Sequence, residues 1–288
     1  MIEIQNKEFK LSKSRFSDGT QKLVVNIVER VSQNYKDTIT ISWRFERESE
    51  VLTLYYLVNW FKDHFANPQI CLKLYYVPYA RMDRVECVED VFTLKYFTSL
   101  INSLEFSRVE ILDPHSRVSA ALINRAMVFE PVQYIRETLR GIIKEGRTLT
   151  VLFPDRGAYE RYLSPELRAV FKEFGITQFL YGEKVRDWKT SNIQNFTINT
   201  RGLRVIENVL IIDDIITTGG TIEECVKALD DIQATGSIFI YTTFLESGAF
   251  QSQKFNWVLD QCEKVFTPAA LPLKLSGLSE KINILPLQ

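Results

Sequence analysis

The chain has 288 residues, of which 45% are hydrophobic and 25% charged, as in soluble globular proteins. This length predicts two domains of ordinary size. A net charge of −1 argues against a protein that coats nucleic acid, and no apolar run approaches the length that spans a bilayer. We therefore expect neither a nucleic-acid partner nor a membrane partner.

The N-terminal residues and the cysteines indicate a cellular compartment. The chain is charged from Glu3 onward, which predicts that no secretory signal opens it. The four cysteines lie far apart and lack the spacing of a metal site: Cys71, Cys87, Cys225 and Cys262. We therefore expect a cytoplasmic protein whose thiols are reduced.

Strand and helix patterns alternate along the chain, which predicts an α/β fold with mostly parallel sheets flanked by helices. The expected strands are 22–27, 38–42, 72–77, 108–112, 148–153, 179–181, 209–212, 237–242, 264–266 and 281–285. The expected helices are 51–64, 91–103, 117–125, 165–174, 221–232 and 256–261. A charged helix between 128 and 146 divides them into two similar domains, 1–135 and 136–288. The last strand is a candidate for packing back on the first domain.

Three polar segments follow or precede expected strands in the first half. Phe16-Ser17-Asp18-Gly19, taken alone, is an ordinary turn, because Asp and Gly favour a bend. Tyr79-Ala80-Arg81-Met82-Asp83-Arg84 follows strand 72–77, and two arginines three apart suit bidentate capture of phosphate oxygens. A solvated loop with a local Asp–Arg pair explains this segment equally well.

The third segment is Asp113-Pro114-His115, which ends strand 108–112. Ligands of an open α/β sheet bind at the carboxyl ends of its strands, where this segment falls. From the residue types alone, a helix-capping Asp and a structural His explain it as well as a site does. Histidine is also an uncommon ligand of magnesium, which prefers oxygen.

Two segments of the second half repeat this scheme. Pro154-Asp155-Arg156-Gly157 follows strand 148–153, and we expect a loop that faces a ligand. Lys184, Arg186 and Lys189 begin a polar, poorly patterned stretch that runs to Thr200. Three cations in six residues could close over a polyphosphate, although a solvated basic loop is the usual explanation of such a run.

The most informative segment runs from Val209 to Thr221. Four apolar residues predict a buried parallel strand, with Asp213 and Asp214 at its carboxyl end. Thr217-Thr218-Gly219-Gly220-Thr221 then opens a helix, whose first N–H groups can receive a phosphate. Two acids beside a phosphate suit vicinal hydroxyls or a magnesium ion, so the segment predicts a ribose-phosphate site. The alternative is a turn with a helix-capping Thr and two solvated acids.

In this order, the segments together resemble the ribose-phosphate pyrophosphokinase (phosphoribosyl-diphosphate, PRPP, synthetase) family from about residue 15 to the end. The resemblance implies two phosphoribosyltransferase-like domains in a homo-oligomer that is at least a dimer. It implies transfer of the β,γ-diphosphoryl group of MgATP to the C1 hydroxyl of ribose 5-phosphate, which gives PRPP and AMP.

The resemblance also implies a role for each segment. Phe16 and Asp18 would reach the adenine of ATP across a subunit interface, and Arg81, Met82 and Arg84 would bind its phosphates. His115 and Asp155 would position Mg²⁺, with His115 also at the ATP site. Lys184 and Arg186 would lie on a flexible catalytic loop. Asp213 and Asp214 would take the ribose hydroxyls, and the 5-phosphate would bind the residues Thr217, Thr218, Gly219, Gly220 and Thr221.

Departures from the family pattern leave the acceptor open. Thr217 stands where the family has an acid, and Arg156 replaces a small or apolar residue. One negative charge fewer and one positive charge more near the sugar would favour an acceptor with more negative charge. A ribose with a 5-diphosphate group, such as ADP-ribose in a salvage route to NAD, is such an acceptor. A PRPP-using phosphoribosyltransferase and an inactive regulatory homologue are the remaining alternatives. The motifs of the first half argue against the former, and the retained Lys184 and Arg186 argue against the latter.

Overall fold

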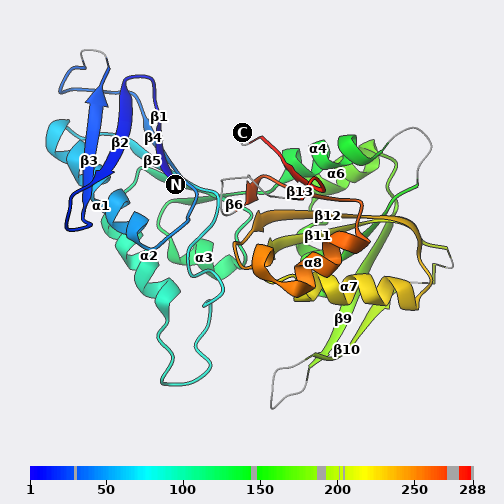
Figure 1. Ribbon diagram of the computed structural model, residues 1–288. Helices are drawn as coiled ribbons and strands as arrows, with labels where there is room; N and C mark the ends of the chain where they lie inside the picture. The colour runs from blue at the N-terminus through cyan, green and yellow to red at the C-terminus, as the bar shows by residue number, and fades with distance from the viewer. Residues whose placement is uncertain are drawn as a thin grey trace. The chain divides into compact units, whose positions relative to one another are not determined.

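The computed structural model describes residues 1–28, 31–143, 148–186, 193–200, 202–203, 205–270 and 279–286. The chain forms two compact units, Met1–Glu130 and Pro131–Gln288, each with its own central sheet (Figure 1). The boundary expected between residues 135 and 136 falls inside helix α4 (Val132–Ile142). That helix lies wholly in the second unit, so the division comes five residues earlier than the sequence suggested.

The first unit is built on a five-stranded sheet in the order β1-β4-β5-β6-β7. β1 is antiparallel to β4, and the other neighbours are parallel. The strands are β1 (Ile2–Gln5), β4 (Ile39–Trp43), β5 (Ile70–Leu74), β6 (Arg108–Leu112) and β7 (Ala126–Phe129). The helices are α1 (Ser49–His64), α2 (Thr93–Ser103) and α3 (Arg117–Leu122). This is the parallel α/β arrangement that the alternating pattern predicts.

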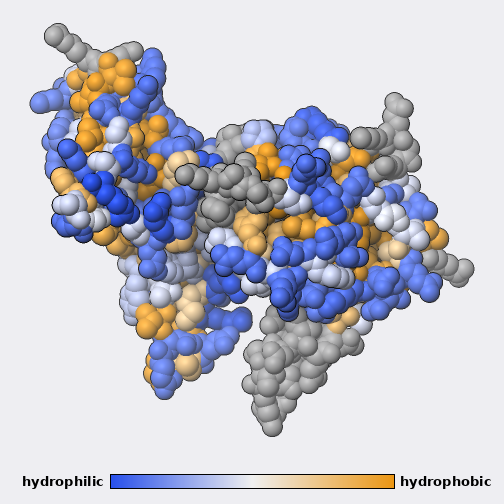
Figure 2. All heavy atoms as spheres, viewed as in Figure 1, coloured by the Kyte–Doolittle hydropathy of each residue, from blue (hydrophilic) through white to orange (hydrophobic). Residues whose placement is uncertain are grey.

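A hairpin of β2 (Phe9–Arg15) and β3 (Gln21–Ile27) forms a separate two-stranded sheet. Several of its apolar residues remain exposed, among them Val24, Ile27 and Val28. Figure 2 shows apolar surface gathered over the end of the unit that carries the hairpin. The strand expected at 22–27 therefore exists, but it belongs to this ribbon instead of the parallel sheet.

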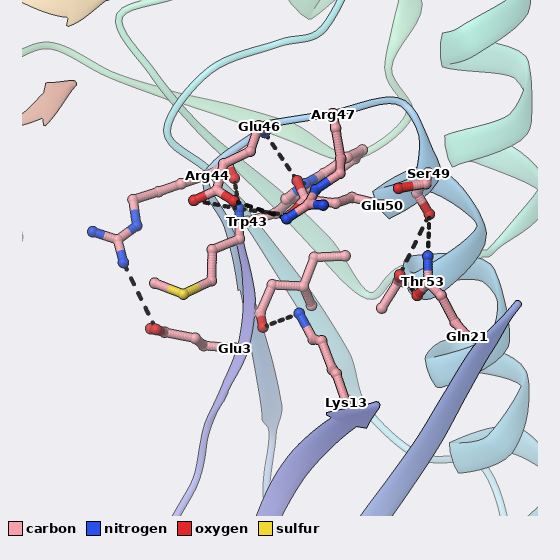
Figure 3. A network of polar contacts seen from close by, with 12 residues as sticks. Glu3, Lys13, Gln21, Trp43, Arg44, Glu46, Arg47, Ser49, Glu50 and Thr53 are labelled. Carbon is pink, nitrogen blue, oxygen red and sulfur yellow. Dashed lines mark hydrogen bonds and ion pairs between the residues drawn. The ribbon is translucent and has the colours of Figure 1, made fainter. Parts of the chain in front are cut away.

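The loop from β4 to α1 is fixed by the carboxylate of Glu50, which is only 6% exposed (Figure 3). Its Oε2 accepts hydrogen bonds from Trp43 Nε1 and from the Glu46 amide, both at 2.9 Å. Its Oε1 lies 2.9 Å from the ammonium of Met1, which also contacts the Arg44 carbonyl. Burial raises the pKa of Glu50, but these hydrogen bonds outweigh burial and bring the pKa below its ordinary value.

The second unit contains a longer sheet in the order β10-β9-β8-β11-β12-β13-β15, with β14 paired to β12. All neighbours are parallel except β9 and β10. The strands are β8 (Thr150–Phe153), β9 (Gln178–Arg186), β10 (Ile193–Asn199), β11 (Glu207–Ile216), β12 (Thr235–Leu245), β13 (Lys264–Thr267), β14 (Ala269–Ala270) and β15 (Ile282–Ile284).

Helices cover both faces of this sheet, with α4 and α6 on one side and α7 and α8 on the other (Figure 1). The helices are α4, α5 (Arg156–Arg161), α6 (Pro165–Glu173), α7 (Gly220–Asp231) and α8 (Gln253–Gln261), with a 3₁₀ turn at Ala249–Gln251. Ser164 begins α6 by accepting a hydrogen bond from the Leu167 amide, ahead of Pro165 in the first turn. Strand β8 is buried along its whole length, as a strand covered on both faces must be.

Three expectations about the second unit need correction. The last strand, β15, pairs with β13 in this unit's own sheet and so does not pack back as a strand of the first domain. The stretch from 184 to 200 is less irregular than expected, because β9 continues to Arg186 and β10 returns antiparallel to it. Arg156 and Gly157, expected to lie in a loop, are the first residues of α5. Each missed feature is short or depends on a partner that is distant in sequence.

Candidate functional site

The acid pair lies at the carboxyl end of β11, which is hydrogen-bonded to β8 on one side and β12 on the other. Leu210, Ile211 and Ile212 are fully buried, so the strand gives the acid pair a rigid base. Val209 and Ile211 pack in the core under α7 and α8. Beyond them, the carboxyl groups of Asp213 and Asp214 lie within hydrogen-bond reach of each other.

Asp214 is an anchored, buried carboxylate, 5% exposed. Arg161, in the last turn of α5, meets it with two nitrogens: Nη1 lies 3.3 Å from Oδ2 and Nη2 lies 3.2 Å from Oδ1. Thr242 Oγ1 on β12 donates to the main-chain oxygen of Asp214 at 3.1 Å. The alternative of two solvated acids in an ordinary turn is therefore wrong for Asp214.

Asp213 is half-buried and differs from its neighbour in charge environment. Burial raises the pKa of its carboxyl group well above the usual range, and the adjacent charge of Asp214 adds to this effect. The Asp214 amide donates to Asp213 Oδ1 at 3.0 Å, which favours the charged form but does not offset the other causes. The carboxyl group of Asp213 therefore holds a proton more readily than an ordinary aspartate.

The loop after the acids turns on Gly219, whose φ of +80° lies in the left-handed region. A Cβ at this position would lie 3.0 Å from the Cα of Phe255, so the loop closes against the first turn of α8. Ser252 Oγ holds the loop from the same side by donating to the Thr218 carbonyl at 2.7 Å. Helix α7 begins at Gly220, so its first N–H groups, which lack intrahelical partners, open toward this loop.

Lys254 adds a cation to this loop from α8. Its ammonium lies 3.6 Å from Glu223 Oε2 in the first turn of α7, and a Cβ on Gly220 would lie 3.7 Å from it. Lys227 pairs with the same acid at 2.9 Å, and this hydrogen bond is the main reason why the pKa of Glu223 is lowered. Two lysines thus compensate the one acid at the helix end where an anion is expected to bind.

Asp155 follows β8 and caps the short helix α5. Its Oδ1 accepts a hydrogen bond from the Ala158 amide at 2.9 Å. The expected ligand-facing loop at 154–157 is thus a helix start, and Arg156 is its first residue. Arg156 is largely exposed and pairs with Glu160 one turn later at 3.0 Å.

Lys184 and Arg186 belong by their backbone to the last residues of β9. Their side chains, and residues 187–192 after them, lie outside the described residues. The two cations of the expected catalytic loop are therefore placed only at the end of a strand of the second sheet. Their role remains a prediction.

In the first unit, Arg81, Met82 and Arg84 follow β5 in a bent segment that starts at Tyr79, whose φ is +62°. The hydroxyl of Tyr79 donates to Glu48 Oε1 at 3.0 Å and so attaches the segment to the start of α1. Arg81 is exposed, and Arg84 pairs with Glu86 at 3.3 Å on the surface. The local pair of this segment therefore involves a glutamate, not the Asp83 that the sequence suggested.

Asp113 and His115 lie between β6 and α3. Asp113 has a φ of +42°, and its amide donates to the Phe129 carbonyl of β7 at 2.9 Å. Ser116, not Asp113, stands at the cap position of α3, so a helix-capping role for Asp113 is wrong. His115 is exposed at this strand end.

Phe16 and Asp18 form the tip of the β2–β3 hairpin. Asp18 Oδ1 accepts from the Thr20 hydroxyl at 2.7 Å and from its amide at 2.9 Å, and these bonds, the hydroxyl first, lower the pKa of Asp18. Phe16 is 54% exposed, with the ammonium of Lys22 at 5.9 Å from its ring centroid. The tip therefore presents an aromatic ring to solvent on an ordered turn.

The chain is similar along most of its length to curated proteins named ribose-phosphate pyrophosphokinase. The relative from Thermococcus kodakarensis is 26% identical over 276 residues, which are 95% of this chain and 90% of the relative. The relative from Pyrococcus abyssi is 24% identical over 92% of this chain and 85% of its own. At this level of identity, the chain is similar to the ribose-phosphate pyrophosphokinase family over most of its length.

A solved structure of phosphoribosylpyrophosphate synthetase from Mycobacterium smegmatis matches the fold with a TM-score of 0.73. The match covers 96% of this chain and 86% of that one at 15% identity. No protein-family model matches the sequence. The predictions of family and α/β fold class are confirmed. Among the described residues, no helix combines the length and apolar character that crossing a membrane requires.

Sequence reasoning missed two residues beside the acid pair and the loop after it, Arg161 and Lys254. Arg161 reaches an acid 53 positions away, and Lys254 reaches the loop from a different helix. A usable signal existed for α5, because Asp155 precedes Ala158 with the spacing of a helix cap. Nothing local to Lys254 marks it.

Proposed function

We propose that this chain transfers the β,γ-diphosphoryl group of MgATP to the C1 hydroxyl of ribose 5-phosphate, releasing PRPP and AMP. The observation that carries the proposal is the acceptor end of β11. A half-buried acid stands beside a left-handed glycine and the N-terminus of α7, in a chain whose relatives are named ribose-phosphate pyrophosphokinase. A ribose phosphate requires hydrogen-bond acceptors for its hydroxyls next to hydrogen-bond donors for its phosphate.

On the donor side, we assign Arg81, Met82 and Arg84 to ATP, with the arginines binding its phosphates. Arginine suits phosphate because its planar fork can donate two parallel hydrogen bonds. Phe16 and Asp18 would meet the adenine of ATP bound by a second copy of the chain, which makes the active form at least a dimer. The exposed ring of Phe16 is suited to stacking on a base.

The described residues could supply Mg²⁺ with a carboxylate ligand but not with a complete set of protein ligands. The described residues contain no group of three His, Cys, Asp or Glu side chains that could hold a metal ion. Mg²⁺ usually keeps several waters and binds one or two carboxylates together with substrate phosphates, and Asp155 supplies such a carboxylate. We also assign His115 to the surroundings of the metal and the ATP. Asp155 is the stronger candidate for a direct ligand of Mg²⁺, because it offers oxygen. When bound, Mg²⁺ would neutralise charge on the ATP phosphates.

The remaining chemistry needs positioning and charge neutralisation more than a protein nucleophile. Asp213 would accept a hydrogen bond from a ribose hydroxyl, while residues 217–221 hold the 5-phosphate through N–H groups and hydroxyls. Lys184 and Arg186 would stabilise charge on the transferred group.

The test is phosphorus NMR of the purified protein with MgATP and ribose 5-phosphate. We expect AMP and a new C1-diphosphate to appear together, and Asp213→Asn to reduce their rate at fixed acceptor concentration. AMP without a C1-diphosphate, or PRPP consumption with a base added, would overturn the proposal in favour of a hydrolase or a transferase. No product at all would favour the regulatory homologue.

A second acceptor, ADP-ribose, is favoured by Arg156. This side chain is 77% exposed and opens the same short helix whose last turn holds Asp214. A cation there would complement the second phosphate of a 5-diphosphate-substituted ribose, and the product would serve NAD salvage. Isothermal titration with both ligands decides between them: tight binding of ribose 5-phosphate with none of ADP-ribose excludes this second acceptor.

A further inference from the structure

We propose that the two acids at the end of β11 have different roles in this chain. Asp214 is a fixed structural anion held by Arg161, and Asp213 alone takes an acceptor hydroxyl. Arg161 is thereby a positioning residue. The inference rests on the proposed function for the nature of the ligand, and it departs from the expectation that both acids take the ribose hydroxyls.

The pair of Arg161 and Asp214 is held in place from both ends. The guanidinium of Arg161 lies 4.8 Å from the ring centroid of Tyr162, which is fully buried. Tyr162 in turn stacks on Phe153 of β8, with 6.1 Å between centroids and 8° between ring planes. Strand β8 pairs directly with β11, so the arginine and the acid belong to one packed body.

Breaking the ion pair between Arg161 and Asp214 would cost free energy. A buried carboxylate that loses its cation is an uncompensated charge in a low-dielectric setting. A neutral hydroxyl of a sugar restores only part of that interaction. Asp214 is therefore expected to remain with Arg161 when the acceptor binds, and to fix the end of the strand.

Asp213 has the opposite properties. It is half-buried, and it precedes the loop of residues 217–221 from which helix α7 begins. Its carboxylate accepts a hydrogen bond from the Asp214 amide and, in the part of the chain that the structure describes, has no cation within ion-pair distance. Burial and the charge of Asp214 raise its pKa, and the charge of Arg161 lowers the pKa without offsetting them. This acid can meet a ligand without breaking an ion pair.

The experiment combines a stability cycle with acceptor kinetics. We expect Arg161→Met and Asp214→Asn each to lower Tm by about 5 °C or more, as loss of one partner of a buried pair does. The double variant should lose less than the sum of the two, and Arg161→Lys should recover part of the loss. Asp213→Asn should stay within about 2 °C of the wild type, as a change at a partly exposed position with no ion pair does.

Kinetics then separate the two acids. We expect Asp213→Asn to raise the acceptor KM about 10-fold, the worth of one hydrogen bond, with ATP KM within about twofold. Asp214→Asn and Arg161→Lys, assayed well below their Tm, should change acceptor KM by less than about threefold, since neither touches the sugar. Equal rises in acceptor KM for both acid variants, with Tm unchanged, would overturn the inference.

The structural role of Arg161 and the ligand role of Asp213 are tested by separate measurements. The Tm cycle uses ligand-free protein and tests the ion pair whatever the acceptor is, so additive losses overturn the structural role of Arg161. Binding of ribose 5-phosphate and of ADP-ribose to the wild type is measured first by titration. Binding of neither overturns the proposed function and the role of Asp213 together, while the cycle still decides the role of Asp214.

Discussion

Gly219 lies against Phe255 with room for a hydrogen and nothing larger. A Cβ on Gly219 would approach both the Cα and the Cβ of Phe255 to 3.0 Å, and Phe255 is fully buried. The glycine also has a φ of +80°, which side chains rarely adopt. Space and backbone conformation therefore demand glycine here for independent reasons.

Gly219→Ala should displace the phosphate loop and lower stability by about 1–3 kcal/mol, from the strained backbone together with the contact against Phe255. We expect a rise in acceptor KM that exceeds any change in ATP KM, measured by initial rates with each substrate varied. The matched control is Gly220→Ala. Gly220 is helical, and its Cβ would meet only Lys254 at 3.7 Å.

For Gly220→Ala we expect unchanged or slightly higher stability, because alanine is the better helix former. A similar loss of stability in both variants would show that the contact with Phe255 is not what requires Gly219.

Glu50→Gln should destabilise the first unit by about 1–3 kcal/mol at neutral pH. The substitution removes the negative charge that accepts hydrogen bonds from Trp43 and the Glu46 amide and pairs with the Met1 ammonium. The folded pKa of Glu50 lies below its ordinary value, so its contribution is present above the unfolded pKa and is lost as pH falls through the folded pKa. Urea unfolding should therefore depend less on acidic pH in the variant than in the wild type. The buried indole of Trp43, bonded to Glu50, offers a fluorescence signal.

The control for Glu50 is Glu105→Gln. Glu105 is 75% exposed and pairs with Lys62 at 2.9 Å on the surface. Exposed pairs contribute little, so we expect a much smaller change. An equal effect in both variants would assign the stability to overall charge instead of the buried network.

Asp155 combines a helix cap with a proposed magnesium contact, and two substitutions separate these roles. Asp155→Asn keeps a capping oxygen, whereas Asp155→Ala should cost about 1 kcal/mol of stability. If Asp155 meets the metal, both variants should lose activity at moderate Mg²⁺, because an amide is a weaker ligand than a carboxylate. Full activity of the Asn variant would reduce Asp155 to a cap.

Lys254→Met should raise the acceptor KM about 3- to 10-fold, because it leaves Glu223 less compensated beside the phosphate loop. The effect should shrink as salt is added to the assay. Lys227→Met is the control, since Lys227 pairs with the same acid but lies over Trp257, 5.8 Å from its ring centroid. A larger effect for Lys227 would contradict a direct role of Lys254.

The sequence predicts β11, its acid pair and the loop that follows because the signals for them are local. An uninterrupted apolar run predicts β11, and the acids and glycines after it are close together, so no long-range contact is needed to see them. The same holds for Arg81 and Arg84 after β5. The α/β fold class follows from the alternation of elements, and it is confirmed by the fold match.

The features that the sequence could not supply depend on partners that are distant in the chain. Helix α5 has six residues, too few for a hydrophobic period to show, and its Arg161 acquires meaning only beside Asp214. β10 follows a polar stretch of sequence, and it becomes a strand by pairing with β9. The side chain of Asp214 could not be distinguished from that of Asp213 by composition, because the difference arises from Arg161, which reaches Asp214 from a separate helix.

The β2–β3 ribbon also bears on how the protein behaves in concentrated solution. Among the described strands, β3 pairs with β2 alone, so its outer edge carries main-chain groups that another molecule can satisfy. Lys10, Lys13 and Lys22 lie on this ribbon, and like charges keep two such edges apart. Salt screens that repulsion, so colloidal stability should decline as ionic strength rises, and light scattering across a salt series would reveal it first.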